Sequence, residues 1–245
     1  QHQDNVQFAA MVESVDESLG RLLARLRALK LDENTIVILF SDNGGMSGGN
    51  LGNPKRVIAP DRLDRAFSTS NLPLRAAKGW LYEGGVRVPL IVKWPGKVKP
   101  GSVCDVPAIG MDFYPTMLEM AGLPARPKEH LDGISLVPWL TNASRSPTRE
   151  SLYWHYPHYH KTKPYGAVRK GDWKLIEFFE DGELELYNLK NDLGEKNNLA
   201  DKQPEKVEEL HAAMLKWRKE TKAPVPIKLN PQFDPMARKS RGKNL

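Results

Sequence analysis

The sequence contains a single cysteine and lacks any hydrophobic run long enough to cross a membrane. The lone cysteine, Cys104, cannot form an internal disulfide, so cysteine usage does not identify the compartment. The longest aliphatic and aromatic run covers residues 36–40, far short of the ~20 residues that a membrane helix needs. The first residues, QHQDNVQ, also lack the basic and apolar regions of a signal peptide. We therefore expect no membrane span and no export signal in this sequence.

Acidic residues are scarce only at the C-terminal end. The formal net charge is +6, but nine of the 36 Lys and Arg and only two of the 30 Asp and Glu lie in residues 214–245. The rest of the chain, with 27 basic and 28 acidic residues, is close to neutral. A basic, proline-containing terminal segment without a zinc-finger or RNP-type motif is more typical of a solvated tail than of a phosphate-binding groove. We expect no nucleic-acid partner.

The composition also excludes disorder throughout the chain. Hydrophobic residues make up 40% of the sequence and charged residues 27%, as in ordinary folded proteins. The length of 245 residues exceeds the ~150 residues expected per domain. We predict an α/β portion over residues 1–145, a smaller subdomain of antiparallel sheet and helix over 146–222, and a basic tail over 223–245. The first boundary rests on the small and polar residues that cluster between 141 and 147.

The first 40 residues predict a helix followed by a buried strand. From Phe8 to Leu29 apolar residues recur at steps of three and four, which places them on one helix face that we expect to be buried. Residues 35–40 are apolar on both faces, as in a central strand of a covered parallel sheet. A second strand is expected over residues 88–94. This order is typical of α/β folds.

Shorter elements follow, and the pattern becomes antiparallel after residue 150. A short helix is predicted with Asp112 as its N-cap and Gly122 as its C-terminal signal. An Asp-Gly pair at 181–182 indicates a hairpin turn. Further predicted elements are a short turn of helix over 135–140, strands over 151–155, 165–169, 173–178 and 183–189, and a closing helix over 204–221 with proline in its first turn.

Two oxygen-bearing side chains, Asp42 and Asn43, follow the first predicted strand directly and are flanked by glycines. In open α/β sheets, functional groups gather beyond the carboxyl ends of strands. A carboxylate and an amide oxygen suit Ca²⁺ or Mg²⁺ rather than a soft metal. An Asx turn that ends the strand is an alternative explanation for the same residues. Two ligands are also too few for calcium, which takes about 6 to 8 oxygens.

Lys78 is a candidate for binding an anionic group. It precedes Gly79 in a glycine-rich stretch and is flanked by Arg75 and Arg87. A solvated surface lysine is the alternative. Glu83 lies four residues before Arg87, and we expect the two to pair in a structural role.

These segments resemble a known family. The run TIVILFSDNG over residues 35–44, followed by PLRAAKGWLYEGGVRVP over 73–89, resembles the C-terminal half of the catalytic domain of a type I sulfatase of the alkaline phosphatase superfamily. Further segments agree in order, among them WPG at 94–96, MDFYPT at 111–116, WKL at 173–175 and ELYNL at 185–189. The resemblance covers about residues 8–221 and implies a portion of an α/β/α sandwich.

The resemblance assigns roles to the candidate residues. It implies that Asp42 and Asn43 bind a metal, usually calcium with Mg²⁺ as the alternative, and that the catalytic residue Lys78 contacts the sulfate oxygens. It implies hydrolysis of sulfate esters, of a sulfated carbohydrate or an aryl sulfate, and a periplasmic or secreted location. A phosphate or phosphonate ester hydrolase of the same superfamily and a catalytically silent anion- or glycan-binding module are the alternatives.

One family feature is missing from the sequence. The formylglycine nucleophile of such sulfatases is made from the cysteine of Cys-x-Pro-Ser-Arg, and Cys104 is followed by Asp-Val-Pro instead. We expect Cys104 to be a small buried hydrophobe. The nucleophile and the remaining metal ligands are expected in an N-terminal half of the same sulfatase, so these 245 residues alone are expected to be inactive.

Half of the six histidines, His155, His158 and His160, lie in the segment WHYPHYH. A zinc site is an alternative, although sites with this many imidazoles and no nearby Cys or acidic partner are a minority. In the resembling family this region often lies near the substrate entrance, which implies contacts between these side chains and a sugar. Surface histidines are the simplest alternative. Separately, Asn142-Ala143-Ser144 matches the N-glycosylation sequon, a pattern with frequent false matches.

Overall fold

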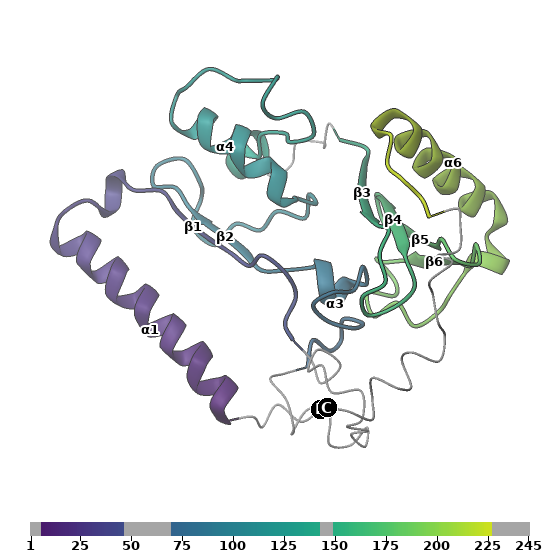
Figure 1. The fold of residues 1–245 in the computed structure, drawn as a ribbon. Coiled ribbons are helices and arrows are strands. Elements are labelled where there is room, and N and C mark those ends of the chain that lie inside the picture. Colours follow the sequence, from purple (N-terminus) through teal and green to yellow (C-terminus); the bar gives the residue numbers. More distant parts are fainter. Residues whose placement is uncertain (1–5, 47–69, 143–148, 227–245) are drawn as a thin grey trace. The chain divides into compact units, whose positions relative to one another are not determined.

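The computed structural model describes residues 6–46, 70–142 and 149–226 (Figure 1). The chain divides into two compact units, one of residues 13–42 and 89–150 and the other of residues 1–12, 43–88 and 151–245. The domain boundaries after residues 145 and 222 stay predictions. Most of the predicted tail and the last two sequon positions lie outside the described residues. In the described ranges no helix is long and apolar enough to span a bilayer.

The first unit contains a two-stranded sheet. Strand β1 (Val37–Phe40) pairs antiparallel with β2 (Leu90–Lys93), with Val37 opposite Lys93 and Phe40 opposite Leu90. The expectation of parallel pairing for the first strand was therefore wrong for the one neighbour that the described residues provide. A run that is apolar on both faces predicts burial between layers, but it does not fix the direction of the partner strand.

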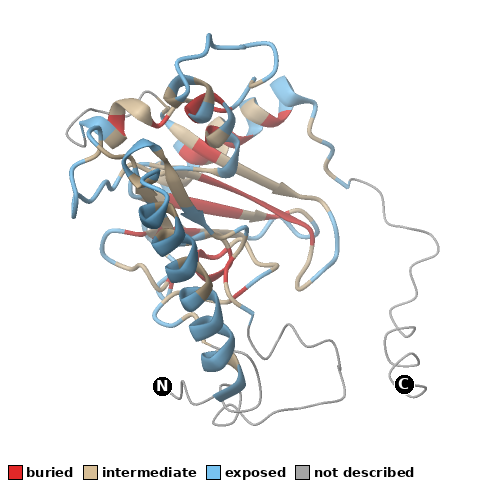
Figure 2. Ribbon diagram, turned by 90° about the vertical axis from the view of Figure 1, so that its left-hand side faces the viewer, coloured by how far each residue is buried: buried red, intermediate tan, exposed pale blue. Residues whose placement is uncertain are grey.

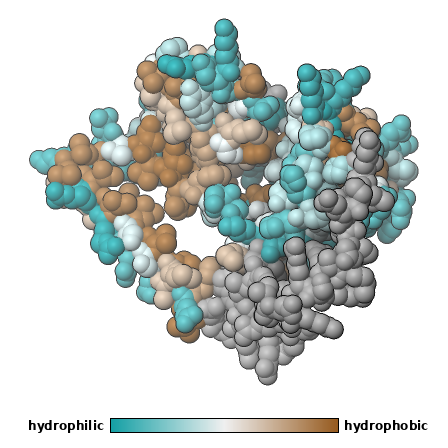
Figure 3. Space-filling model, in the orientation of Figure 1, coloured by the Kyte–Doolittle hydropathy of each residue, from teal (hydrophilic) through white to brown (hydrophobic). Residues whose placement is uncertain are grey.

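Helix α1 (Val6–Ala28) forms as its periodicity predicts, but its apolar face is not covered. No residue of α1 is buried, and Val15 and Leu22 are 64% and 65% exposed. The helix is mostly pale blue in Figure 2, with tan at its half-buried residues, and brown side chains lie along it in Figure 3. The expectation of a buried face is thus wrong for the described residues, because periodicity places apolar side chains on one face without supplying the layer that covers them.

A buried ion pair organises the helical part of the same unit. Asp112 ends the 3-10 helix η4 (Gly110–Asp112) and directly precedes α4 (Phe113–Met120). Asp112 is the N-cap residue of α4, as predicted, but its side chain makes no capping hydrogen bond to that helix. Its carboxylate instead accepts hydrogen bonds from the Ile109 and Ile134 amides, at 2.9 and 3.0 Å, and from Arg149, at 2.7 and 2.8 Å.

The end of α4, the short helix after it and Cys104 complete the comparison of this unit with the predictions. Gly122 follows α4 with a φ of +68°, as expected for a helix C-terminus. The short helix predicted from residue 135 is α5 (Val137–Thr141). Cys104 is exposed, so its assignment as a buried hydrophobe was wrong.

The second unit is built on a four-stranded antiparallel sheet in the order β3-β4-β5-β6. Helix α6 packs against one face, where Leu210 and Met214 contact Val168, Leu175 and Leu186. The other face carries a second core that includes Tyr82 from the chain before the short helix α3 (Glu83–Val86). The remaining bounds are β3 (Ser151–Tyr156), β4 (Tyr165–Lys170), β5 (Trp173–Phe178), β6 (Leu184–Asn188) and α6 (Pro204–Thr221).

We predict that Asp112→Ala destabilises the protein by about 3 to 5 kcal/mol, the usual cost of removing one partner of a buried ion pair. The variant leaves the Arg149 guanidinium and two backbone amides without their carboxylate. Chemical denaturation measures the change in unfolding free energy. Glu119→Ala, at an exposed position of α4, is the control and should change it by less than about 0.5 kcal/mol. Equal losses in the two variants would contradict the structural role of Asp112.

Candidate active site

The loop after β1 carries the two predicted metal ligands. Asp42 is exposed, and Asn43 is half-buried. The side-chain Nδ2 of Asn43 donates a hydrogen bond to the Gly44 carbonyl oxygen at 3.0 Å, which restricts the orientation of the side-chain amide. One carboxylate and one amide are hard oxygen donors, so these residues fit a calcium or magnesium ion. In the described part of the chain, no three His, Cys, Asp or Glu side chains converge as a metal site.

Gly44 anchors this loop to helix α3. Its amide donates to the Gly85 carbonyl oxygen at 2.9 Å. A Cβ added to Gly44 would lie 1.8 Å from the Gly84 carbonyl oxygen, far inside contact distance. The residue after Asn43 therefore has to be glycine for the loop to approach α3 this closely.

The segment that carries Lys78 lies directly beside the Asn43 loop. The Lys78 amide donates to the Gly45 carbonyl oxygen at 3.1 Å. The side-chain amide of Asn71 donates to the same Gly45 oxygen at 2.9 Å and to the Ala76 carbonyl oxygen at 3.2 Å. The backbone thus brings the segments of two predicted site residues together, and the Lys78 side chain is exposed.

The same segment also packs on α3 through backbone contacts. The Gly84 amide donates to the Arg75 carbonyl oxygen at 2.8 Å. A Cβ on Gly84 would lie 2.3 Å from the Ala76 carbonyl oxygen, and one on Gly85 would lie 2.1 Å from that of Trp80. Helix α3 is therefore a glycine surface on which the Asn43 loop and the Lys78 segment both rest.

His160 from the C-terminal subdomain reaches the residue after Lys78. A Cβ built on Gly79 would lie 2.8 Å from the imidazole Cε1 of His160, so the ring lies against the backbone of Gly79. His158 and His160 both lie near Tyr156, with ring centroids 5.9 and 6.0 Å from the tyrosine ring. Two of the three predicted histidines are thus gathered around one tyrosine.

Tyr165 supports this arrangement from β4. Its hydroxyl accepts a hydrogen bond from the Leu81 amide at 2.9 Å and donates one to the Gly79 carbonyl oxygen at 3.3 Å. Burial raises the pKa of Tyr165 to about 12, so the hydroxyl keeps its proton at neutral pH.

His155 lies apart from the other two histidines. Its Nε2 is 2.7 Å from the Pro224 carbonyl oxygen, and its ring lies 5.3 and 6.1 Å from those of Phe179 and Trp217. Burial lowers the pKa of His155 below the ordinary histidine value. Neighbouring residues of a strand point to opposite faces, so His155 and Tyr156 serve different faces of the sheet.

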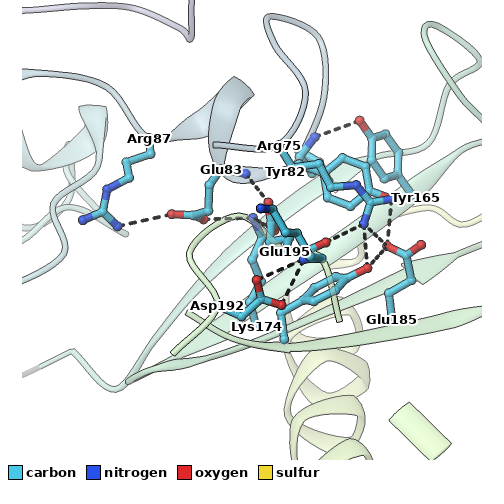
Figure 4. A network of polar contacts seen from close by, with 12 residues as sticks. Arg75, Tyr82, Glu83, Arg87, Tyr165, Lys174, Glu185, Asp192 and Glu195 are labelled. Atoms are coloured by element: carbon cyan, nitrogen blue, oxygen red, sulfur yellow. Dashed lines mark hydrogen bonds and ion pairs between the residues drawn. The ribbon is translucent and has the colours of Figure 1, made fainter. Parts of the chain in front are cut away.

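Behind α3 lies a buried ion cluster that the sequence analysis did not find (Figure 4). The Lys174 ammonium is 2.9 Å from a carboxylate oxygen of Glu83 and 2.8 Å from one of Glu195. The second Glu195 oxygen accepts the backbone amide of Glu83 at 2.7 Å. All three residues are at most 2% exposed.

The strand pattern held a signal for this cluster. Residues two apart on a strand share a face, and Lys174 shares its face with Ile176 and Phe178, both in the core. A lysine on an apolar face has to be paired inside the protein. That signal indicates a buried partner but does not identify Glu83 or Glu195, which are distant in sequence.

The two carboxylates of the cluster respond differently to burial. For Glu83, burial alone would raise the pKa, but the Lys174 ammonium and, more weakly, Arg169 and Arg87 outweigh it, so the pKa lies below the ordinary value. The expected Glu83 and Arg87 pair is present at 3.4 Å. For Glu195, burial dominates over Lys174 and the pKa is raised. The Lys174 ammonium lies at nearly the same distance from both carboxylates, at 2.9 Å from Glu83 and 2.8 Å from Glu195.

Arg75 is committed to the protein rather than available to a substrate, which corrects the role suggested by its position near Lys78. Its guanidinium donates to the Tyr187 hydroxyl at 2.7 Å and to the Glu195 carbonyl oxygen at 3.1 Å. It also lies 3.8 Å from the centre of the Tyr82 ring, within range of a cation–π interaction. These contacts join the start of the Lys78 segment to the C-terminal sheet.

The oxygen-donor loop and the Lys78 segment thus lie side by side on α3. The fold of the chain is the alkaline phosphatase fold that solved sulfatase structures have. A complex of one protein with its substrate D-glucosamine-2-N,6-O-disulfate has a TM-score of 0.67 and 30% identity, over 86% of this chain and 39% of that chain. A complex with k-i-k-neocarrahexaose has a TM-score of 0.72 and 28% identity, over 89% and 44%.

Family comparisons agree with the fold. The family model described as N-sulphoglucosamine sulphohydrolase, C-terminal, matches residues 76–221, and the one described as Sulfatase matches residues 3–123. A sulfatase of Formosa agariphila is 39% identical over 216 residues, which cover 80% of this chain and 36% of the relative. The chain belongs to the sulfatase family. It spans about two fifths of the length of the relatives it matches.

We predict that Gly85→Ala destabilises the protein by about 1 to 3 kcal/mol, because the new methyl group overlaps the Trp80 carbonyl oxygen. Gly20→Ala is the matched control: it lies in helix α1 with no atom within 4 Å of the added Cβ. The control should stabilise the protein by about 0.5 to 1 kcal/mol, since alanine favours helix over glycine. Unfolding free energies of the three proteins check both signs, and an unchanged Gly85→Ala variant would refute the close packing on α3.

Proposed function

We propose that this chain is the C-terminal part of a sulfatase that hydrolyses sulfate esters of carbohydrates or aryl compounds with the help of a calcium ion. The observation that supports this best is the packing of the Asn43 loop and the Lys78 segment side by side on α3. A cation held beside a lysine suits a sulfate ester, because the cation and the ammonium group both neutralise the negative charge on the sulfate oxygens. Membership of the sulfatase family favours sulfate over phosphate or phosphonate esters.

In this proposal Asp42 and Asn43 hold the cation through side-chain oxygens, and magnesium is the alternative ion. A bound divalent cation neutralises the sulfate and acts as a Lewis acid on its oxygens. Lys78 donates hydrogen bonds to the sulfate and stabilises the charge that develops as the ester S–O bond breaks. The exposed Lys78 side chain is accessible to a substrate from solvent.

The nucleophile and the other metal ligands belong, in this proposal, to an N-terminal half of the same sulfatase. The 245 residues contain no Cys-x-Pro-Ser-Arg sequence for conversion to formylglycine. The apolar face of α1 offers a surface for that half, because a large exposed apolar face usually marks an interaction site. Without the N-terminal half, the chain would bind the substrate anion but could not cleave the ester.

The substrate proposed is a sulfated glycan. One structural neighbour was solved with D-glucosamine-2-N,6-O-disulfate as its substrate. In this chain the imidazole of His160 lies against Gly79, next to Lys78, and Tyr156 and His158 lie beside it. Tyrosine and histidine side chains can stack on a sugar ring and hydrogen-bond its hydroxyl groups. These residues are therefore suited to bind the sugar that carries the sulfate.

Metal and lysine roles are separable by mutation in the full-length protein. Asp42→Ala and Asn43→Ala should each weaken calcium binding at least about tenfold, because each removes an oxygen ligand. Lys78→Ala should leave calcium affinity unchanged and lower kcat for an aryl sulfate about 100-fold or more. Calorimetry measures the first effect and steady-state kinetics the second.

Two outcomes would contradict these assignments. Unchanged calcium affinity in both ligand variants would remove the metal assignment. Calcium binding by the wild-type protein without turnover of any aryl sulfate or carbohydrate sulfate would favour the catalytically silent binding module instead.

The histidines should affect substrate choice rather than sulfate cleavage. His160→Ala and His158→Ala should lower kcat/KM for a carbohydrate sulfate about tenfold and leave that for a small aryl sulfate nearly unchanged, because the aryl ester reaches only the sulfate pocket. His155→Ala is the comparison: since His155 packs against Trp217 and Pro224, we expect an effect on stability and none on specificity. Equal losses on both substrates would place His160 in the chemistry or the core.

A further inference from the structure

We propose that Glu83, Lys174 and Glu195 are positioning residues that hold α3 and thereby set both halves of the candidate site together. The cluster touches neither the proposed metal nor the proposed sulfate. It acts through the backbone of α3, on which the Asn43 loop and the Lys78 segment rest. The inference rests on the proposed function for its effect on catalysis, but its structural part can be tested separately.

The cluster fixes the start of α3. Glu83 is the first residue of the helix. Its carboxylate accepts a hydrogen bond from Lys174, and its backbone amide donates one to Glu195. Lys174 belongs to β5, the third strand of a four-stranded sheet. A four-residue helix has little stability of its own, so its position depends on these tertiary contacts.

The position of α3 sets the positions of both the Asn43 loop and the Lys78 segment. Gly84 and Gly85 contact the segment from Arg75 to Trp80 through backbone atoms, with no side chain that could adjust. Gly44 contacts the same two glycines from the other segment. A shift of α3 by a fraction of an ångström would therefore move both segments, since close-packed backbones transmit displacement.

Burying the charges of the cluster costs free energy, so the cluster is favourable only when its charged groups are held in the right geometry. Two carboxylates and one ammonium are buried together, and the desolvation of such groups offsets most of their attraction. Arg75 adds a second tie by donating to the Glu195 carbonyl oxygen at 3.1 Å (Figure 4). The arrangement fixes the directions of Glu83 and Glu195, because the Glu83 carboxylate accepts from Lys174 and the Glu195 carboxylate accepts the Glu83 amide and lies 2.8 Å from the same ammonium.

The test compares Lys174→Met and Glu195→Gln with Arg149→Met in the full-length protein. Arg149→Met breaks another largely buried ion pair, that with Asp112, which lies in the other unit, and controls for general loss of stability. Hydrogen exchange followed by mass spectrometry reports on peptides that contain the Gly44 and Lys78 amides. We expect exchange of both to accelerate at least tenfold in the two cluster variants and to stay unchanged in Arg149→Met.

The functional readouts are calcium affinity and kcat for an aryl sulfate, measured well below the unfolding temperature. We expect both to fall together, each about tenfold or more, in the cluster variants, whereas Lys78→Ala lowers only kcat. If Lys174→Met does not fold, Glu195→Gln carries the test, since it keeps the size and an oxygen acceptor for the Glu83 amide. If exchange accelerates in the cluster variants but the wild-type protein has no sulfatase activity, the proposed function is refuted and the positioning role of the cluster is supported.

Three results would overturn the inference. The first is unchanged exchange at Gly44 and Lys78 in a folded Glu195→Gln variant. The second is equal acceleration in Arg149→Met, which would indicate general destabilisation. The third is a fall in kcat with unchanged calcium affinity in the cluster variants, which would mean that α3 does not link the two segments.

Discussion

Backbone-to-backbone contact at Gly84 and Gly85 is the constraint on which the candidate site depends. Hydrogen bonds from Gly44 to Gly85 and from Gly84 to Arg75 need an approach that a single methyl group would prevent. Side chains near such contacts cannot compensate for a displacement, so the relative position of the two segments is set by the backbone. A site that has to hold a cation and an ammonium at fixed places around one anion benefits from this rigidity, because preorganised charges stabilise a transition state without reorganisation.

The charges behind α3 serve a different purpose from the charges expected at the substrate. Lys174 is fully buried and paired, whereas Lys78 and Asp42 are exposed. A buried ion cluster contributes little net stability, since the loss of hydration offsets its attraction. The cluster instead orients its members. The pKa of Glu83 is lowered because the Lys174 ammonium, which comes from the neighbouring sheet, stabilises the charged carboxylate. The exposed side chains of Lys78 and Asp42 can be reached by a ligand from solvent, and the buried groups hold α3 in place.

Local patterns predicted the elements of the C-terminal subdomain well. The helix Pro204–Thr221 and the strand Trp173–Phe178 have the predicted bounds, because proline, the hairpin turn and strand alternation are signals within a few residues. What depends on distant partners was missed or misread. Examples are the uncovered face of α1, the antiparallel partner of β1, the exposed Cys104 and the commitment of Arg75 to Tyr187. The segments of Asn43 and Lys78 were found through a family resemblance, and composition alone favoured an Asx turn and a surface lysine.

Strand alternation explains why three histidines close in sequence do not lie together. Along β3, His155 faces Trp217 of α6, while Tyr156 packs on the opposite face with Tyr165. The face that α6 covers carries a core cluster in which Leu210 and Met214 pack on the strands. The opposite face receives Tyr82 and the end of the Lys78 segment. Of the three histidines, His160 is therefore the one whose ring lies beside the Lys78 segment, where it meets Gly79.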